Sequence, residues 1–168
     1  MKHHGPRYHV KPRRQRQGRT DYRKRLRLLK SRETRIVVRK SLKQTRVQFV
    51  GYHLHGDEIL VSASSLELST KYHWKHPVSN TPAAYLTGVL AGKRAQEQGI
   101  SQGILDVGRA FPTTGSKLFA ALKGVVDAGI TCPYDEAKIP SEDRLMGKHM
   151  GNDLSSQVTK IKQQILEA

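Results

Sequence analysis

The segment from Gly108 to Lys117 is the first candidate for chemistry, because it joins an apolar strand-like run to a helix-like one through glycines and a lysine. Loops of this kind cradle nucleotide phosphates when the spacing is right. Here six residues rather than four separate Gly108 from Gly115, and Ser116 precedes Lys117 instead of following it. The segment therefore predicts no nucleotide hydrolysis.

Histidines and carboxylates form the second candidate. His53 and His55 point to the same side of an extended segment, and Asp57 follows them, but no fourth ligand comes at a useful spacing for a metal. A two-metal nuclease would need clustered carboxylates on adjacent strands. Asp57, Asp106 and Asp127 instead stand at the ends of predicted strands or helices, where capping and turn formation explain them. We expect no metal, no cofactor and no enzymatic activity.

The distribution of charge is the strongest signal in the chain. Residues 1–46 contain 18 Lys and Arg against only Asp21 and Glu33, whereas the following 122 residues carry 12 charges of each sign. The whole net charge of +16 therefore lies at one end. A concentration of this kind creates a surface that a phosphate backbone can occupy.

Residues 1–20 form the most basic part, which we call the arm. It contains Gly5, Pro6, Pro12 and Gly18 and almost no aliphatic side chains, so we expect it to be disordered until a polyanion orders it. Arginine outnumbers lysine there, and a guanidinium both forks onto phosphate oxygens and stacks on bases, which favours nucleic acid over a membrane surface. Tyrosines interleaved with these charges offer stacking faces for unpaired bases.

Residues 20–30 predict a basic helix with Thr20 as its cap. Tyr22, Leu26 and Leu29 recur at helical spacing, so we expect this stripe to dock on the rest of the protein and to leave the arginines outward. A basic amphipathic helix also suits a membrane or a calmodulin-like groove, but three apolar residues make a narrow stripe.

The remaining sequence predicts the elements that position these charges. Strand-like runs at 35–40, 45–50 and 58–63 indicate an antiparallel meander. A helix from Thr81 to Gly99, a buried strand at 103–107, a helix from Ser116 to Gly129 and a terminal helix follow. This order predicts an α/β fold with a mixed sheet and helices on its faces. We expect an arm at 1–20, a core domain at 21–132 and a C-terminal extension at 133–168.

Composition excludes several classes of protein. The single Cys132 excludes an internal disulfide, and no apolar run approaches the roughly 20 residues that span a bilayer. We expect a soluble, intracellular protein.

Several ordered blocks resemble a known family, the archaeal form of ribosomal large-subunit protein eighteen. The blocks are Gly18-Arg19-Thr20-Asp21-Tyr22 with residues 26–31, residues 35–41, Asn80 to Gly88, and Gly115-Ser116-Lys117 with Phe119 and residues 122–124. Together they cover nearly the whole chain at the expected separations.

The resemblance implies a three-layer α/β domain of ribonuclease-H-like shape that lacks the catalytic carboxylates. It also implies a cytoplasmic, non-enzymatic protein that binds 5S ribosomal RNA and helps attach it to large-subunit RNA in the central protuberance, beside neighbouring ribosomal proteins. The expected RNA contacts are Arg7, Tyr8, Arg13, Arg14, Arg16, Arg19, Tyr22, Arg23, Arg25, Arg27, Lys30, Arg39, Lys40, Lys43 and Arg46. At the hairpin tip, Leu42 and Gln44 depart from the Ser-Asn-Lys-His of many family members, which leaves specific polar contacts there open.

The alternative function is a sequence-tolerant, chromatin-type protein that uses the same arm on DNA. A third class, a metal-dependent nuclease, would require cleavage of RNA in the presence of magnesium, against the expectation of no enzymatic activity. Competition between 5S RNA and duplex DNA separates the DNA-binding alternative from the ribosomal hypothesis, and the integrity of the RNA tests the nuclease.

Overall fold

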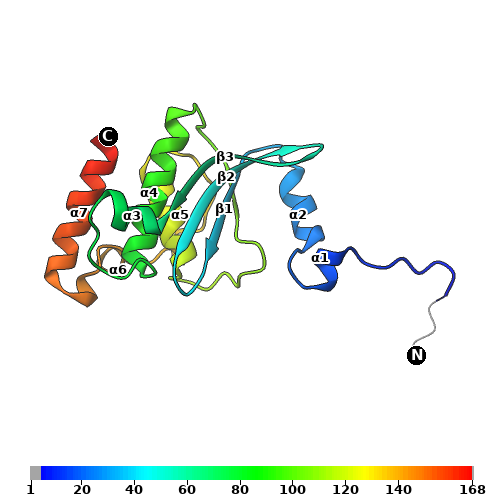
Figure 1. Cartoon of the computed structure of the whole chain (residues 1–168), viewed down its shortest axis with the longest axis horizontal. Helices are drawn as coiled ribbons and strands as arrows, with labels where there is room; N and C mark the ends of the chain where they lie inside the picture. The colour runs from blue at the N-terminus through cyan, green and yellow to red at the C-terminus, as the bar shows by residue number, and fades with distance from the viewer. Residues whose placement is uncertain (1–4, 168) are drawn as a thin grey trace.

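The computed structural model describes residues 5–167 and combines one sheet with helices (Figure 1). The elements are α1 (Arg13–Arg16), α2 (Tyr22–Leu29), β1 (Arg35–Lys40), β2 (Thr45–His53), β3 (Gly56–Ser64), α3 (Ser65–Lys71), α4 (Thr81–Glu97), β4 (Ile104–Asp106), α5 (Lys117–Asp127), η1 (Glu136–Lys138), α6 (Glu142–Leu145), η2 (Lys148–Met150) and α7 (Asn152–Glu167).

The four strands form one mixed sheet in the order β3-β2-β1-β4. β1, β2 and β3 pair antiparallel, as their alternating sequence predicts, and β4 pairs parallel to β1 after the long α4 crossover. The predicted α/β fold with a mixed sheet is therefore confirmed. The β2–β3 hairpin is longer than expected, since both strands continue to a tight turn at residues 54–55.

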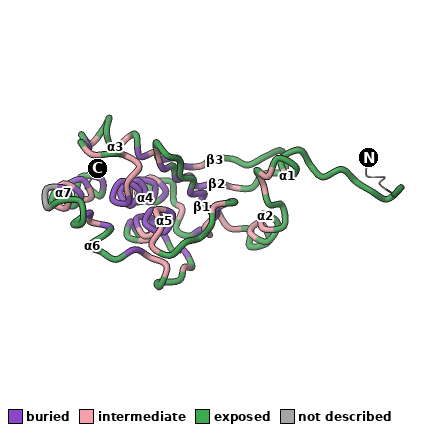
Figure 2. The backbone as a smooth tube through the Cα atoms, turned by 90° about the horizontal axis from the view of Figure 1, so that it is seen from below, coloured by how far each residue is buried: buried purple, intermediate pink, exposed green. Residues whose placement is uncertain are grey.

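One face of the sheet carries the core, which the buried segments in Figure 2 mark. Ile36 and Val38 of β1 and Val47 and Phe49 of β2 are completely buried in the same cluster as α4 and α5. α7 packs against α4 through one apolar stripe at helical spacing. All four residues predicted for that stripe are buried, namely Leu154, Val158, Ile161 and Ile165.

α4 and α5 approach so closely that their glycines have no room for a side chain. A Cβ at Gly88 would fall on the carbonyl oxygen of Ala121, and a Cβ at Gly124 would fall on the carbonyl oxygen of Tyr85. The small residues of these helices are therefore a requirement of backbone contact.

Tyr85 links α4, α5 and α7 through a polar contact beside the core. Its hydroxyl donates a 2.6 Å hydrogen bond to Asp127, while Lys123 and Lys162 lie 3.0 and 3.7 Å from the same carboxylate. Burial, together with this bond to a carboxylate, raises the pKa of Tyr85. The hydroxyl therefore stays protonated and acts as a donor.

Tyr85→Phe should lower the free energy of unfolding by about 1.5 kcal/mol, because it removes a hydrogen bond to a charged group. Urea unfolding of the full chain measures this loss. Tyr52→Phe is the matched control, since Tyr52 is 58% exposed and its change should have no measurable effect. Equal stability of the Tyr85 variant and the wild type would mean that this bond contributes nothing.

α2 lies against the opposite face of the sheet, and the expectation for it was wrong in two respects. Asp21, not Thr20, is the N-cap, accepting hydrogen bonds from the amides of Arg23 and Lys24. The predicted docking stripe is largely exposed, at 38% for Tyr22 and 59% for Leu26. The helix instead turns Lys24, Arg25 and Leu28 toward the sheet, because polar contacts rather than apolar packing orient it.

Candidate nucleic-acid interface

The fifteen predicted RNA contacts lie on one end of the molecule and are open to solvent. Arg7 and Tyr8 belong to the irregular segment before α1, and the others follow through α1, α2, the end of β1, the 41–44 turn and the start of β2. Every one is exposed except Arg25, which is half-buried. Figure 1 shows the arm and α2 at the opposite side of the molecule from α7.

The part of the arm after residue 12 folds back beside the first turn of α2. Pro12 precedes the single helical turn of α1, and Gly18 reverses the chain with a φ of +67°. The side chain of Arg14 donates a 3.0 Å hydrogen bond to the hydroxyl of Thr20, and the amide of Arg19 donates to the carbonyl oxygen of Arg14. These bonds bring the arm arginines close to the basic helix.

The hairpin contributes a pair of like charges. Arg39 and Arg46 are directly opposite each other in the β1–β2 register, on the face of the sheet that α2 covers. The guanidinium of Arg39 turns away from Arg46, since it donates to the carbonyl oxygen of Asp106 and lies 3.4 Å from its carboxylate, on the β4 side of β1. Asp106 therefore offsets the charge of Arg39.

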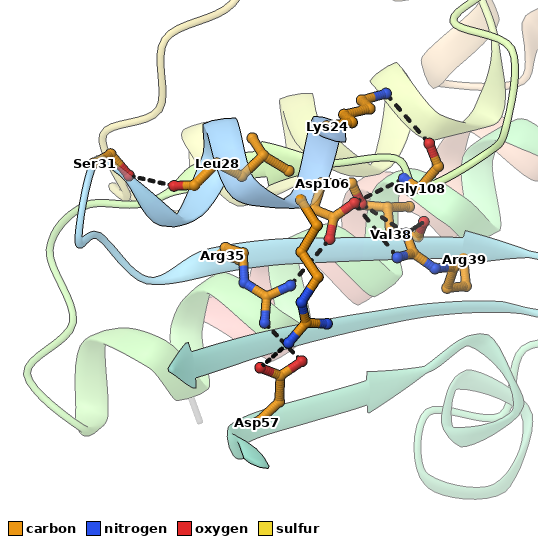
Figure 3. A network of polar contacts seen from close by, with 10 residues as sticks. Lys24, Leu28, Ser31, Arg35, Val38, Arg39, Asp57, Asp106 and Gly108 are labelled. Atoms are coloured by element: carbon orange, nitrogen blue, oxygen red, sulfur yellow. Dashed lines mark hydrogen bonds and ion pairs between the residues drawn. The ribbon is translucent and has the colours of Figure 1, made fainter. Parts of the chain in front are cut away.

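Arg35 is the centre of the polar network under α2 (Figure 3). It is only 3% exposed, and its Nη1 donates a 3.2 Å hydrogen bond to Asp106. Its Nη2 lies 2.8 Å from Asp57, to which Arg25 of α2 also donates a hydrogen bond of 2.7 Å. Arg39 donates to the carbonyl oxygen of Asp106 at 2.7 Å. The network therefore fixes β1, the β3 start and β4 relative to α2.

Asp57 stays ionised in this network. Partial burial alone would raise the pKa of its carboxyl group, but the contacts with Arg35 and Arg25 outweigh burial and hold the pKa below its usual value. The approach of Arg35 Nη2 to Asp57 is an ion pair outside hydrogen-bond geometry, and the attraction between the charges does not depend on that angle. Asp57 thus keeps its charge over the whole physiological pH range.

Sequence reasoning missed three cationic residues at this interface. Lys24 donates a 3.2 Å hydrogen bond to the carbonyl oxygen of Gly108, which joins α2 to the β4–α5 loop. Arg109 of that loop lies against Gly18, and Arg35 lies beneath both. The loop also exposes Phe111, at 81%. Lys24 was visible as part of a basic helix, whereas no periodic signal singles out Arg109.

The hairpin tip offers charge but few directed polar groups. Leu42 is 96% exposed, and the side-chain oxygen of Gln44 accepts a 2.9 Å hydrogen bond from the hydroxyl of Ser64. Ser41 holds the turn by accepting from the amides of Lys43 and Gln44. Lys43 is therefore the side chain at this tip that can meet a phosphate.

Other kinds of site were sought over the described residues. Among the side chains described by the structure, no three His, Cys, Asp or Glu come together as metal ligands. His53 and His55 stack with ring centroids 6.4 Å apart. None of the described helices has the length and apolar character needed to cross a membrane.

Comparison with known proteins identifies the family. The chain matches the family described as "Ribosomal large subunit proteins 60S L5, and 50S L18" over residues 6–103 and 95–135. It is 52% identical to large ribosomal subunit protein uL18 of Korarchaeum cryptofilum over 146 residues, which are 87% of this chain and 74% of that protein. It is 46% identical to the uL18 of Methanococcoides burtonii over 167 residues, which are 96% of each chain.

A third relative, uL18 of Haloarcula marismortui, is 49% identical over 146 residues, or 87% of this chain and 78% of that protein. The match to the family includes the arm from residue 6, the sheet, and α4 and α5. The chain therefore belongs to the family of ribosomal large-subunit proteins 60S L5 and 50S L18.

Proposed function

We propose that the protein is a structural constituent of the large ribosomal subunit in the cytoplasm, where it binds 5S ribosomal RNA. In this role it helps to attach 5S RNA to the large-subunit RNA in the central protuberance, beside neighbouring proteins. The observation that carries the proposal is the exposed cationic surface that runs from the arm over α2 to the β1–β2 hairpin. The family, whose members are named as ribosomal proteins, agrees with the non-enzymatic role expected from the sequence.

Phosphate contacts supply most of the affinity in this proposal and fix the orientation of the protein. The arginines of the arm and of α2 make these contacts, and the arm becomes fully ordered on the RNA. Tyr8 and Tyr22 are 49% and 38% exposed, so their rings are accessible for stacking on unpaired bases. The antiparallel β1–β2 hairpin holds Lys43 and Arg46 at fixed positions. These two charges therefore favour an RNA whose phosphates lie at matching positions.

Binding of the purified chain to 5S RNA over a series of salt concentrations tests this function. If about eight phosphates are engaged, log Kd should rise with log salt at a slope of roughly 0.7 to 0.9 per phosphate. Transfer RNA and duplex DNA of equal length serve as competitors, and we expect 5S RNA to be preferred strongly over both. A flat salt dependence, or equal competition by DNA, would refute the proposal, and equal competition would favour the DNA-binding alternative.

A further inference from the structure

A pocket of about 310 Å³ lies between the arm, α2, the outer face of the sheet and the β4–α5 loop. Arg14 and Arg19 of the arm, Lys24 of α2 and Arg109 of the loop contribute cationic side chains to it. Arg35 and Arg39 of β1 line it from the sheet. The arm, α2, β1 and the β4–α5 loop therefore bring positive charge to one pocket.

The carboxylates of the pocket do not neutralise this charge. Seven Lys and Arg line it against three Asp. Asp57 and Asp106 pair with Arg25, Arg35 and Arg39, and Asp21 accepts from the amides of the α2 N-terminus. Among the side chains that the structure describes, no carboxylate lies within ion-pair distance of the four cationic groups of the arm, α2 and the loop, which are Arg14, Arg19, Lys24 and Arg109.

A buried donor without a partner lies at the same place. Nε of Arg35 is inaccessible to solvent and makes no hydrogen bond within the described part of the chain. Buried polar groups are nearly always paired in folded proteins, and an unpaired one costs about 1–3 kcal/mol. The unpaired donor belongs to a residue of the pocket wall, and the surplus of cations in the pocket favours an anion.

We propose that this pocket binds one phosphate group, which Arg19, Lys24 and Arg109 contact directly while Arg35 supports it from below. A guanidinium forks onto two phosphate oxygens and an ammonium adds a point charge, so these groups suit a tetrahedral oxyanion. If the phosphate belongs to RNA, the inference rests on the proposed function. The pocket is then one specific phosphate-binding site within the RNA interface. The bound group then ties the arm, α2 and the β4–α5 loop together.

The test compares two charge-neutralising variants of the full chain, Arg109→Gln and Arg144→Gln. Arg109 is an exposed residue of the pocket, whereas Arg144 is an exposed residue of α6 that does not line it. Inorganic phosphate is titrated against chloride at equal ionic strength, and the backbone amide signals of Gly18, Gly108 and Lys24 are followed by NMR. Saturable shifts should appear in the wild type and in Arg144→Gln, and should be lost in Arg109→Gln.

The second part of the test uses 5S RNA and distinguishes a phosphate of RNA from a free phosphate. Arg109→Gln should weaken RNA binding about fivefold and reduce the salt slope by about 1, while Arg144→Gln leaves both unchanged. Saturable phosphate binding without an RNA difference between the variants would assign the pocket to a free anion and overturn its role in RNA binding. Equal phosphate binding and equal RNA binding by the two variants would overturn the site itself. Failure of the wild type to bind RNA would instead count against the proposed function.

Discussion

Removal of residues 1–20 is expected to weaken binding to 5S RNA by about three orders of magnitude near 0.15 M salt. The deleted segment carries seven of the 18 basic residues before position 47. If about five of them contact phosphates, each contributes roughly a fourfold to fivefold change through counterion release at this salt concentration. The salt slope should fall by about 4 in the same experiment.

The truncated protein should keep its fold. The N-cap of α2 is Asp21, which remains, and neither the arm nor α1 contains a buried residue among those described. A thermal melt of the truncated chain should therefore match that of the full chain within a few degrees. Loss of folding would show that the arm is structural and would remove the basis of the affinity prediction.

A charge control completes this experiment. Lys71, Lys75 and Lys160 line a second surface region near α3 and α7, on the side of the molecule away from the arm (Figure 1). Replacing these three lysines by glutamine should change the affinity for 5S RNA by less than about threefold. A loss comparable to that of the truncation would mean that total charge, not the arm, determines binding.

Gly124→Ala should cost about 3 kcal/mol of folding free energy, at the upper end of overpacking effects. Alanine in place of glycine inside a helix normally stabilises it by about 1 kcal/mol, so the expected change is opposite to helix propensity. The new methyl group would fall on the carbonyl oxygen of Tyr85 and come within 2.8 Å of the amide nitrogen of Val89. Backbone atoms cannot rotate away, so α4 and α5 must separate.

Urea unfolding measures this effect, with Gly5→Ala as the control. A Cβ at Gly5 meets nothing within 4 Å, so the same chemical change there should leave the midpoint unaltered. A stabilised Gly124→Ala variant would show that the helices are further apart than described. A variant too unstable to purify would agree with the prediction.

The elements whose signal is local were predictable from the sequence. The strand at 35–40 is rich in β-branched residues, and β1 has the same bounds. α3 was not predicted, although Ser64 and Glu67 form a capping box that marks its start. The stripe of Tyr22 and Leu26 suggested the wrong docking face, because ion pairs and hydrogen bonds decide the orientation of so short a helix.

The site was predictable in its charge but not in its three-dimensional arrangement. The fifteen expected contacts share one end of the molecule because they share one end of the sequence. Arg35 and Asp106 are 71 positions apart, and only the parallel pairing of β1 with β4 brings them together. Arg109 joins the arm for the same reason, since its loop follows β4. Pairings at this separation leave no periodic trace in a single sequence.

The pairing of Arg39 with Asp106 has a thermodynamic consequence for the cationic surface. The guanidinium of Arg39 donates to the carbonyl oxygen of Asp106 and lies 3.4 Å from its carboxylate, toward β4 and away from Arg46. The fold thus balances part of its own positive charge before any partner arrives. Under the proposed function, RNA that binds only the folded chain adds to its stability by mass action.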